Sequence, residues 1–153
     1  MWYILTAVLI CAADQLLKRY ADANLEYAKD RPVLGGRILL TKYHNRGAML
    51  NLLEEKREGL MALSGAASGC ALTLFLRSLK KGRPSVRLAF ALITGGAASN
   101  MSDRIRKGYV VDYFRFSFLK RVIFNLADLS IFLGSILMVL CQFGKDNKAG
   151  QGE

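Results

Sequence analysis

The chain contains few of the side chains that build disulfides, zinc sites or histidine-dependent catalytic centres. It has three cysteines and one histidine among 153 residues. Cys11, Cys70 and Cys141 lie in apolar stretches with neither a paired nor a metal-ligand spacing, so we expect small buried apolar residues. His44 has no Ser or Cys placed beside it that would support a catalytic triad. The sequence therefore gives no support to a disulfide framework, a zinc site or triad chemistry.

Acidic residues are also scarce, and they are unevenly placed. The chain has 12 Asp and Glu against 22 Lys and Arg, a formal net charge of +10, and no acid lies between Glu58 and Asp103. Such a balance can indicate a nucleic-acid partner, but here the basic residues flank apolar stretches, which is typical of contacts with lipid headgroups. We therefore expect membrane lipids, and no nucleic acid, as partners.

Hydrophobic residues make up 52% of the chain, and they are concentrated in four stretches. These stretches predict helices at about 2–17, 60–79, 88–103 and 122–143, each near the ~20 residues that cross a bilayer or slightly shorter. The expected fold class is an all-α membrane protein whose four transmembrane helices form a single domain, 1–143. The first helix lacks a basic leader and a cleavage site, so we expect it to be retained. The polar tail, 144–153, is expected to be disordered and cytoplasmic.

Two segments outside the helices predict a small β-sheet. After a turn at 31–36, Arg37 to His44 is rich in branched and aromatic residues, which is typical of a strand. Residues 109–116 alternate in polarity and could pair with that strand. The fold class thus includes a small sheet, with one part between helices one and two and another between helices three and four.

Basic residues predict how the chain is oriented in a membrane. The loop between the second and third helices carries five basic residues and no acid: Arg77, Lys80, Lys81, Arg83 and Arg87. The positive-inside rule places this loop and both termini in the cytoplasm. The opposite helix ends and the sheet then lie at the extracytoplasmic face.

The carboxylates fall at helix ends that share one side of the membrane. Alternation brings together the end of helix one, the start of two, the end of three and the start of four. Asp14, Asp103 and Asp128 occupy three of these ends, and Asp112 lies in the loop between two of them. A carboxylate at membrane depth is costly, which makes each of these residues a candidate for function.

An Asn-x-x-Asp spacing occurs twice, at Asn100 with Asp103 and at Asn125 with Asp128, and it places both side chains on one helical face. Together with Asp112, the pattern brings three carboxylates and two amides within reach of one another. Crowded carboxyl groups share a proton, as in aspartic proteases, so that one acts as a base on water and another as an acid. The spacing does not distinguish Asp103 from the other two. The same pattern also suits polar residues that join helices by hydrogen bonds.

Two further patterns favour structural roles. Asp14 and Lys18 are four residues apart, the spacing of an ion pair on a helix. The small residues at 95–98 and at 65–69 are typical of helices that pack closely in membranes.

Several short polar elements follow one another along the chain. They are Asp14-Gln15-Leu16-Leu17-Lys18, Asn45-Arg46-Gly47-Ala48, Gly95-Gly96-Ala97 with Asn100-Met101-Ser102-Asp103-Arg104, Gly108-Tyr109-Val110-Val111-Asp112-Tyr113, and Phe124-Asn125-Leu126-Ala127-Asp128. Each element is a weak signal alone. In this order, on a frame of four apolar stretches, they closely resemble the lipoprotein signal peptidases, the type II signal peptidases of bacteria.

The resemblance implies an aspartic endopeptidase of the bacterial inner membrane. Such an enzyme removes the signal peptide of diacylglyceryl-modified prolipoproteins just before the lipidated cysteine, with no metal or organic cofactor. By motif, the catalytic pair would be Asp112 and Asp128. The residues that would bind substrate or support the pair are Asp14, Lys18, Asn45, Gly47, Asn100, Asp103, Arg104 and Asn125. The chain is expected to act as a monomer on prolipoprotein substrates.

Two alternatives remain at this point. One is a catalytically inactive relative that binds lipoproteins without cutting them. The other is a small four-helix transporter of ions or lipids, in which the carboxylates form an ion or proton site. A transporter would need polar residues deep within its spans, whereas residues 72–76 and 131–140 are almost wholly apolar. The distribution favours a hydrolase at the membrane surface.

Overall fold

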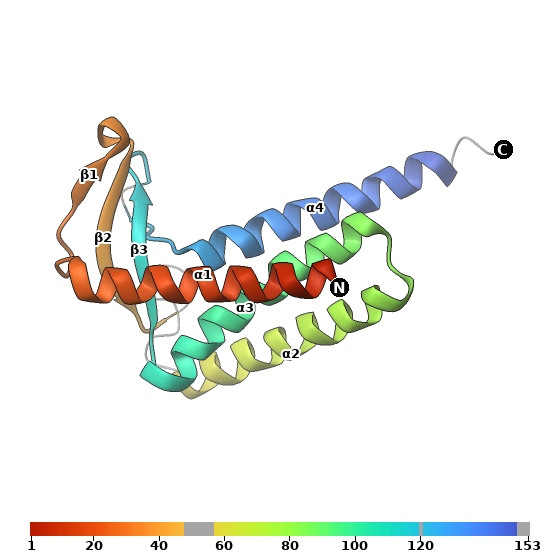
Figure 1. Ribbon diagram of the computed structural model, residues 1–153, viewed down its shortest axis with the longest axis horizontal. Coiled ribbons are helices and arrows are strands. Elements are labelled where there is room, and N and C mark those ends of the chain that lie inside the picture. The colour runs from red at the N-terminus through yellow and green to blue at the C-terminus, as the bar shows by residue number, and fades with distance from the viewer. Residues whose placement is uncertain (48–56, 120, 150–153) are drawn as a thin grey trace.

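The computed structural model describes residues 1–47, 57–119 and 121–149. These residues form four helices and a three-stranded sheet (Figure 1). In chain order the elements are α1 (Trp2–Asn24), β1 (Arg31–Val33), the short 3-10 helix η1 (Leu34–Gly36), β2 (Ile38–Asn45), α2 (Arg57–Lys81), α3 (Pro84–Lys107), β3 (Val110–Phe116) and α4 (Leu126–Ala149). The fold is mostly helical with a small sheet, as predicted.

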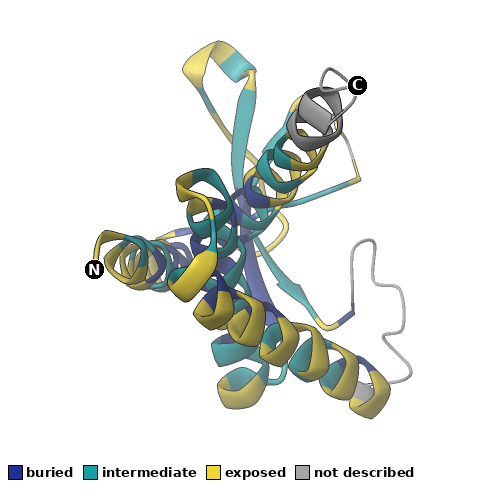
Figure 2. Cartoon of the chain, turned by 90° about the vertical axis from the view of Figure 1, so that its right-hand side faces the viewer, coloured by how far each residue is buried: buried dark blue, intermediate teal, exposed yellow. Residues whose placement is uncertain are grey.

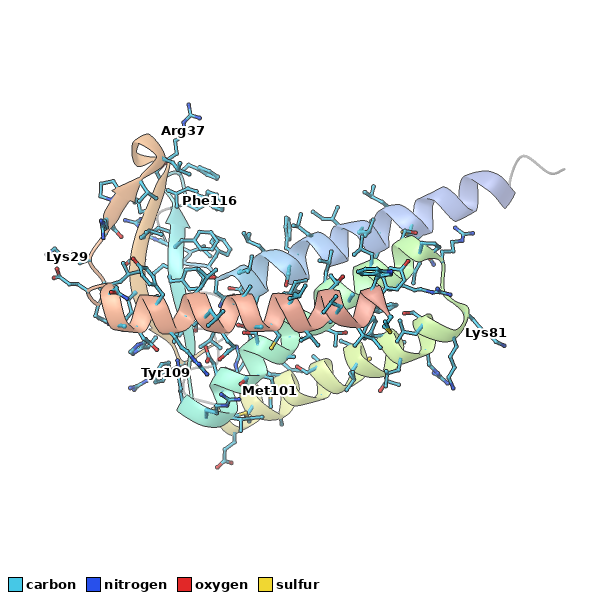
Figure 3. The ribbon with its side chains drawn as sticks, viewed as in Figure 1. Lys29, Arg37, Lys81, Met101, Tyr109 and Phe116 are labelled. Carbon is cyan, nitrogen blue, oxygen red and sulfur yellow. The ribbon has the colours of Figure 1, made fainter. Side chains whose placement is uncertain are left out.

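The helices alternate along the bundle in the predicted way. Figure 1 shows that the end of α1, the start of α2, the end of α3 and the start of α4 lie at the end of the bundle that carries the sheet. The amino terminus and the turn between α2 and α3 lie at the opposite end, where Figure 3 labels Lys81. The four helix ends that the sequence analysis grouped together are therefore neighbours.

Helix boundaries differ from the predicted ones because polar residues extend the helices beyond their apolar stretches. α1 continues to Asn24 and α3 to Lys107. α4 begins only at Leu126 and continues to Ala149, so it covers most of the segment that was expected to be disordered; residues 150–153 lie outside the described residues. Once a helix has formed, each added residue gains a backbone hydrogen bond. Gly144, the glycine in the added part of α4, costs only about 1 kcal/mol relative to alanine.

The sheet is antiparallel, with β2 in the middle. Ile38 pairs with Val33 on one side and with Phe116 on the other, and Asn45 pairs with Val110. The predicted pairing of the two long strands is thus confirmed. Gly35 and Gly36, at φ 66° and 81°, make the tight turn from β1 into β2 that other residues adopt only with strain.

α3 is the central helix of the bundle and packs against α1, α2 and α4. A Cβ atom added to Gly95 would lie 2.7 Å from the carbonyl oxygen of Ala7 on α1. The predicted close packing at 95–98 is therefore confirmed. The stripe at 65–69 serves packing only in part, because Gly65 approaches Met101 of α3 whereas Gly69 faces open space.

Buried residues gather toward the centre of the molecule, and exposed residues lie on the outer faces of the helices (Figure 2). Most of the largest fully buried side chains are polar: Lys18, Asn125, Thr41, Asp14, Asp103 and Ser99. By contrast, Trp2 is 79% exposed and Phe132 is 61% exposed. Apolar surface on this scale needs an apolar environment outside the protein, which a bilayer provides.

By length and hydropathy, one helix among the described residues, Glu58–Lys81, is long and apolar enough to cross a membrane. Leu126–Gln142 is apolar but shorter. The other two helices carry charged side chains along part of their length, which lowers their mean hydropathy.

The prediction that the cysteines are buried is wrong. Cys70 is exposed, and Cys11 and Cys141 are only partly buried; none of the three forms a disulfide. Leu72, near Cys70, and Leu140, beside Cys141, are exposed as well, so an apolar stretch does not by itself place a residue in the protein interior.

The contact between α1 and α3 should be sensitive to a single methyl group. We expect Gly95→Ala to lower the free energy of unfolding by about 1–3 kcal/mol, because the new Cβ meets the backbone of α1. Gly69→Ala, a matched change at an open position, should be neutral or slightly stabilising. Thermal unfolding of both variants in the same detergent tests this; equal stabilities would contradict it.

Candidate active site

The first turn of α4 holds one of the two predicted catalytic aspartates by a reciprocal cap. The Asn125 side-chain oxygen accepts a hydrogen bond from the Asp128 N–H at 2.8 Å, and Asp128 Oδ2 accepts one from the Asn125 N–H at 3.2 Å. This is the geometry of a capping box, in which residues three apart satisfy each other's backbone donors. The Asn-x-x-Asp spacing at 125–128 thus begins the helix and orients the carboxylate.

Two other elements supply partners for the remaining amides of this turn. The Leu126 N–H donates to the Tyr113 hydroxyl at 2.9 Å, and the Ala127 N–H donates to Asp14 Oδ1 at 3.1 Å. The Tyr113 hydroxyl in turn donates to Asp14 Oδ1. The start of α4 is therefore tied to β3 and to α1 at one point.

Asp112 lies on β3 and is held by two amides. Its Oδ1 accepts a hydrogen bond from Asn125 Nδ2 at 2.7 Å, and its Oδ2 accepts one from Asn45 Nδ2 at 3.0 Å. The Asn45 side-chain oxygen accepts the Gly47 N–H at 3.1 Å, which fixes the turn after β2. Asn125 thus contacts both predicted catalytic residues, since it donates to Asp112 and caps Asp128.

Asp14, Lys18 and Asp103 form a separate, fully buried cluster. Lys18 Nζ lies 2.8 Å from Asp14 Oδ2 and 3.3 Å from Asp103 Oδ2, so the predicted ion pair on α1 is confirmed and extended. Asp14 Oδ2 also accepts the Ser99 hydroxyl at 2.6 Å. Asp103 Oδ2 accepts the Val111 N–H at 3.2 Å, which positions β3 beside α3. Lys18 pairs with both acids, Lys107 lies 3.7 Å from Asp103 Oδ1, and neutral donors orient the two carboxylates.

Asn100 joins the two groups of carboxylates. Its side-chain oxygen accepts from Lys18 Nζ at 2.7 Å, and its Nδ2 donates to Asp128 Oδ1 at 2.8 Å. Asn100 and Asp103, which the spacing placed on one face, therefore both contact Lys18, and Asn100 also contacts Asp128.

A cavity of about 900 Å³ opens beside the sheet. Among the described residues, the acids that line it are Asp112 and Asp128, and Asn45, Asn100 and Arg104 line it as well. The rest of the lining is mainly apolar and comes from β3, the segment after it and α4: Val110, Phe116, Leu119, Val122, Ile123, Phe124, Leu129, Ile131 and Phe132. Asp14, Lys18 and Asp103 lie outside this lining.

The electrostatic setting of Asp112 favours a proton on this carboxyl group. Burial, followed by the negative charge of Asp128, raises the pKa of Asp112 to about 7. Two buried carboxyl groups that face one cavity, and that both accept hydrogen bonds from Asn125, are unfavourable when both are ionised. The pair can therefore hold one proton near neutral pH.

Most of the predicted site residues lie in the hydrogen-bonded network that joins α1, α3, β3 and the start of α4. Gly47 lies at its edge, where its carbonyl accepts a long hydrogen bond of 3.5 Å from Arg104. The sequence analysis missed Ser99 and Tyr113 as partners of Asp14, and Gln15 as a donor to Asp103. Gln15 and Tyr113 stand beside predicted site residues in the chain, but adjacency alone does not identify a hydrogen-bond partner.

Known proteins resemble this chain over most of its length. A profile of the family described as "Signal peptidase (SPase) II" matches residues 6–144. This chain belongs to the signal peptidase II family. Curated relatives of that family are similar over nearly their full length. The lipoprotein signal peptidase of Moorella thermoacetica is 37% identical over 138 residues, which is 90% of this chain and 90% of that protein. The lipoprotein signal peptidase of Brevibacillus brevis is 33% identical over 150 residues, or 97% of this chain and 100% of that protein.

Solved structures show the same fold. A bacterial membrane enzyme solved at 2.3 Å by the in meso method superposes with a TM-score of 0.85 at 25% identity, covering 99% of this chain and 92% of that chain. A second, solved at 1.9 Å, gives a TM-score of 0.78 at 26% identity, covering 92% of this chain and 91% of that one. Both are bacterial membrane enzymes, which agrees with the apolar outer surface of this signal peptidase II family member.

Asn125 caps α4 through its side-chain oxygen and donates to Asp112 through its Nδ2, and the contribution of the cap can be measured separately. Asn125→Ser keeps an oxygen that can cap the Asp128 N–H, whereas Asn125→Ala removes it. We therefore expect Asn125→Ala to lower the free energy of unfolding by about 1 kcal/mol more than Asn125→Ser does. Thermal unfolding in detergent is the measurement, and equal stability of the two variants would show that the cap contributes little.

Proposed function

We propose that this chain is an aspartic endopeptidase that cleaves the signal peptide from diacylglyceryl-modified prolipoproteins just before the lipidated cysteine. One observation carries the proposal. Asp112 and Asp128 are the acids that line the large cavity within the described residues, and amide side chains hold both of them. The relatives named lipoprotein signal peptidase support the substrate class.

The proposed reaction uses the two carboxyl groups in different protonation states. Asp112, whose pKa is raised to about 7, carries the shared proton and donates it to the oxygen of the scissile carbonyl. Ionised Asp128, which accepts hydrogen bonds from Asn100 and the Asn125 N–H, takes a proton from water as that water attacks the carbonyl carbon. Asp128 then passes its proton to the leaving amine as the peptide bond breaks, and Asp112 takes back the proton from the gem-diol hydroxyl as the carbonyl re-forms, which restores both carboxyl groups. The water supplies the hydroxyl group of the new carboxyl terminus.

The shape of the cavity suits a lipidated peptide. Its polar end is formed by Asn45, Asn100, Arg104 and the two aspartates, and its apolar part follows α4 through Leu129 and Phe132. Acyl chains beside the apolar part would leave the peptide at the polar end, where the carboxyl groups lie. The peptide cannot pair with β2 over Ile38–Leu40, because β1 and β3 occupy both edges there.

In our proposal the four helices span the bacterial inner membrane, with the sheet and cavity at the extracytoplasmic face and both termini in the cytoplasm. The basic residues of the α2–α3 turn support this orientation, because they lie at the end opposite the sheet. We propose further that the enzyme acts as a monomer, because one chain supplies both carboxyl groups and their amide partners.

The proposal is tested by cleavage of a purified lipidated prolipoprotein in detergent or lipid. We expect product from this substrate and not from the unlipidated precursor. Asp112→Asn and Asp128→Asn should each lower kcat by about 10²–10⁴-fold, because each removes one partner in proton transfer, while the lipidated peptide remains bound. Asp30→Asn, a matched change at an aspartate that contacts Arg115 and does not line the cavity, should retain cleavage.

The other outcomes of this experiment separate the alternatives. A folded wild-type protein that binds the lipidated peptide without cutting it would be an inactive relative. A protein that neither cleaves nor binds it would favour a transporter. Cleavage retained by either cavity variant would remove that residue from the catalytic pair.

The pH dependence of cleavage follows from the raised pKa of Asp112. As pH rises through about 7, Asp112 loses the proton that it must donate, so kcat/KM should fall above that value. Above this pH, kcat/KM should decrease by about tenfold for each pH unit, which is the slope expected for the loss of one proton. Initial rates with lipidated substrate between pH 5 and pH 9 measure it; a profile that stays flat to pH 9 would contradict this role for Asp112.

A further inference from the structure

Lys18 contacts the catalytic region without reaching the cavity. The side chain is fully buried on α1, and its Nζ contacts Asn100 Oδ1 at 2.7 Å, Asp14 Oδ2 at 2.8 Å and Asp103 Oδ2 at 3.3 Å. An ammonium group has three N–H donors and no acceptor, so these three oxygens satisfy it. Lys18 is not part of the cavity lining, so it makes no contact with a bound substrate; it acts on the site through these partners and through its charge, which opposes the rise that burial causes in the pKa of Asp112.

The contact with Asn100 fixes the orientation of a carboxamide. The oxygen of Asn100 must face the ammonium, because Lys18 can only donate, and the NH2 group therefore faces Asp128 Oδ1 at 2.8 Å. A rotated amide would place its NH2 group against Lys18 and its oxygen against the carboxylate, and both contacts would be repulsive. The Asn125 Nδ2 donor, 3.2 Å from Asn100 Oδ1, selects the same orientation.

The oriented donor in turn determines how Asp128 is held. Asn100 occupies Oδ1 and the Asn125 N–H occupies Oδ2, so both oxygens of Asp128 have fixed donors. Hydrogen bonds to a carboxylate stabilise its ionised form, which is the form that accepts a proton from water. The charged groups around this path are Asp14 on α1, Asp103 and Arg104 on α3, and Asp112 on β3.

We infer that Lys18 is a positioning residue, which acts through Asn100 to direct a hydrogen-bond donor at Asp128 and to keep that carboxylate ready as the base. The inference rests on the proposed function, because it assigns a role within the same site. It differs from a structural role for the buried ion pair, since a structural role alone would alter stability and not the chemical step.

The first test is a double-mutant cycle on lipidated prolipoprotein cleavage. Lys18→Met should lower kcat at least about tenfold and change KM less than about twofold, and the acid limb of the pH profile should move to higher pH. In an Asn100→Ala background, the same Lys18→Met change should lower kcat by less than about threefold, because the contact through Asn100 is already absent and only the direct effect of the Lys18 charge remains. Independent effects that multiply would overturn the inference.

The matched control is Lys107→Met. Lys107 lies 3.7 Å from Asp103 and 2.8 Å from Asp22, and it does not line the cavity. Its loss removes a cation near the same buried acid without removing the Lys18 contact to Asn100, so kcat should stay within about twofold of wild type. An equal loss of kcat in both lysine variants would show that only the local charge matters.

Loss of Lys18 leaves two buried acids short of a cation, so the single variant could fail to fold. The double variant Lys18→Met/Asp103→Asn removes one charge of each sign, and its kcat is compared with that of Asp103→Asn alone. Relative to Asp103→Asn, the double variant should show the same decrease in kcat, at least about tenfold, that Lys18→Met shows relative to wild type. A folded double variant whose kcat equals that of Asp103→Asn would overturn the inference.

A readout without turnover separates this inference from the proposed function. The side-chain amide NMR signals of Asn100, assigned by their loss in Asn100→Ala, should shift in Lys18→Met and stay in place in Lys107→Met. If the wild-type protein does not cleave, the proposed function fails while this shift still tests the orientation of Asn100. Signals that do not move in Lys18→Met would overturn the inference.

Discussion

The amino end of α4 requires hydrogen-bond partners that the helix itself cannot supply, and the rest of the molecule is arranged around that need. The first amides of any helix lack internal acceptors, and in an apolar environment they cannot turn to water. Here the acceptors come from Tyr113 on β3, Asp14 on α1 and the cap residue Asn125. These hydrogen bonds join α4 to the sheet and to α1 at the turn that carries Asp128.

The buried charges divide into two groups with opposite consequences. Asp14 and Asp103 are paired with Lys18 and have additional donors, so their charges are compensated within the protein. Asp112 and Asp128 receive neutral amide donors and face a cavity. Amide donors orient a carboxylate but do not cancel its charge, and two such groups close together favour a shared proton. The first group is suited to holding structure, and the second to proton transfer.

The distribution of side chains reverses the pattern of a water-soluble protein. Fully buried positions hold Lys18, Asn125 and Asp103, whereas large apolar residues cover the outside of the helices. Close approach of α3 to its neighbours is permitted by glycine at Gly95. In such a molecule the polar network supplies specific contacts between helices, because apolar side chains gain nothing by leaving a lipid environment.

The sequence by itself determined the four helices, their alternation, the two long strands and the grouping of the acids, because each follows from local periodicity and from the limited ways in which a chain crosses a membrane. The spacing of the acids did not separate Asp103 from Asp112 and Asp128; the family resemblance implied different roles, and only the tertiary structure gave the physical reason, since Asp103 meets Lys18 and the other two face the cavity. All three satisfy the same spacing argument, but which carboxylate meets Lys18 and which faces the cavity depends on how helices rotate about their axes when they pack. The outward position of Cys70 and the contact of Tyr113 with Asp14 were decided in the same way. A local pattern fixes which residues share a face, and only packing decides what that face meets.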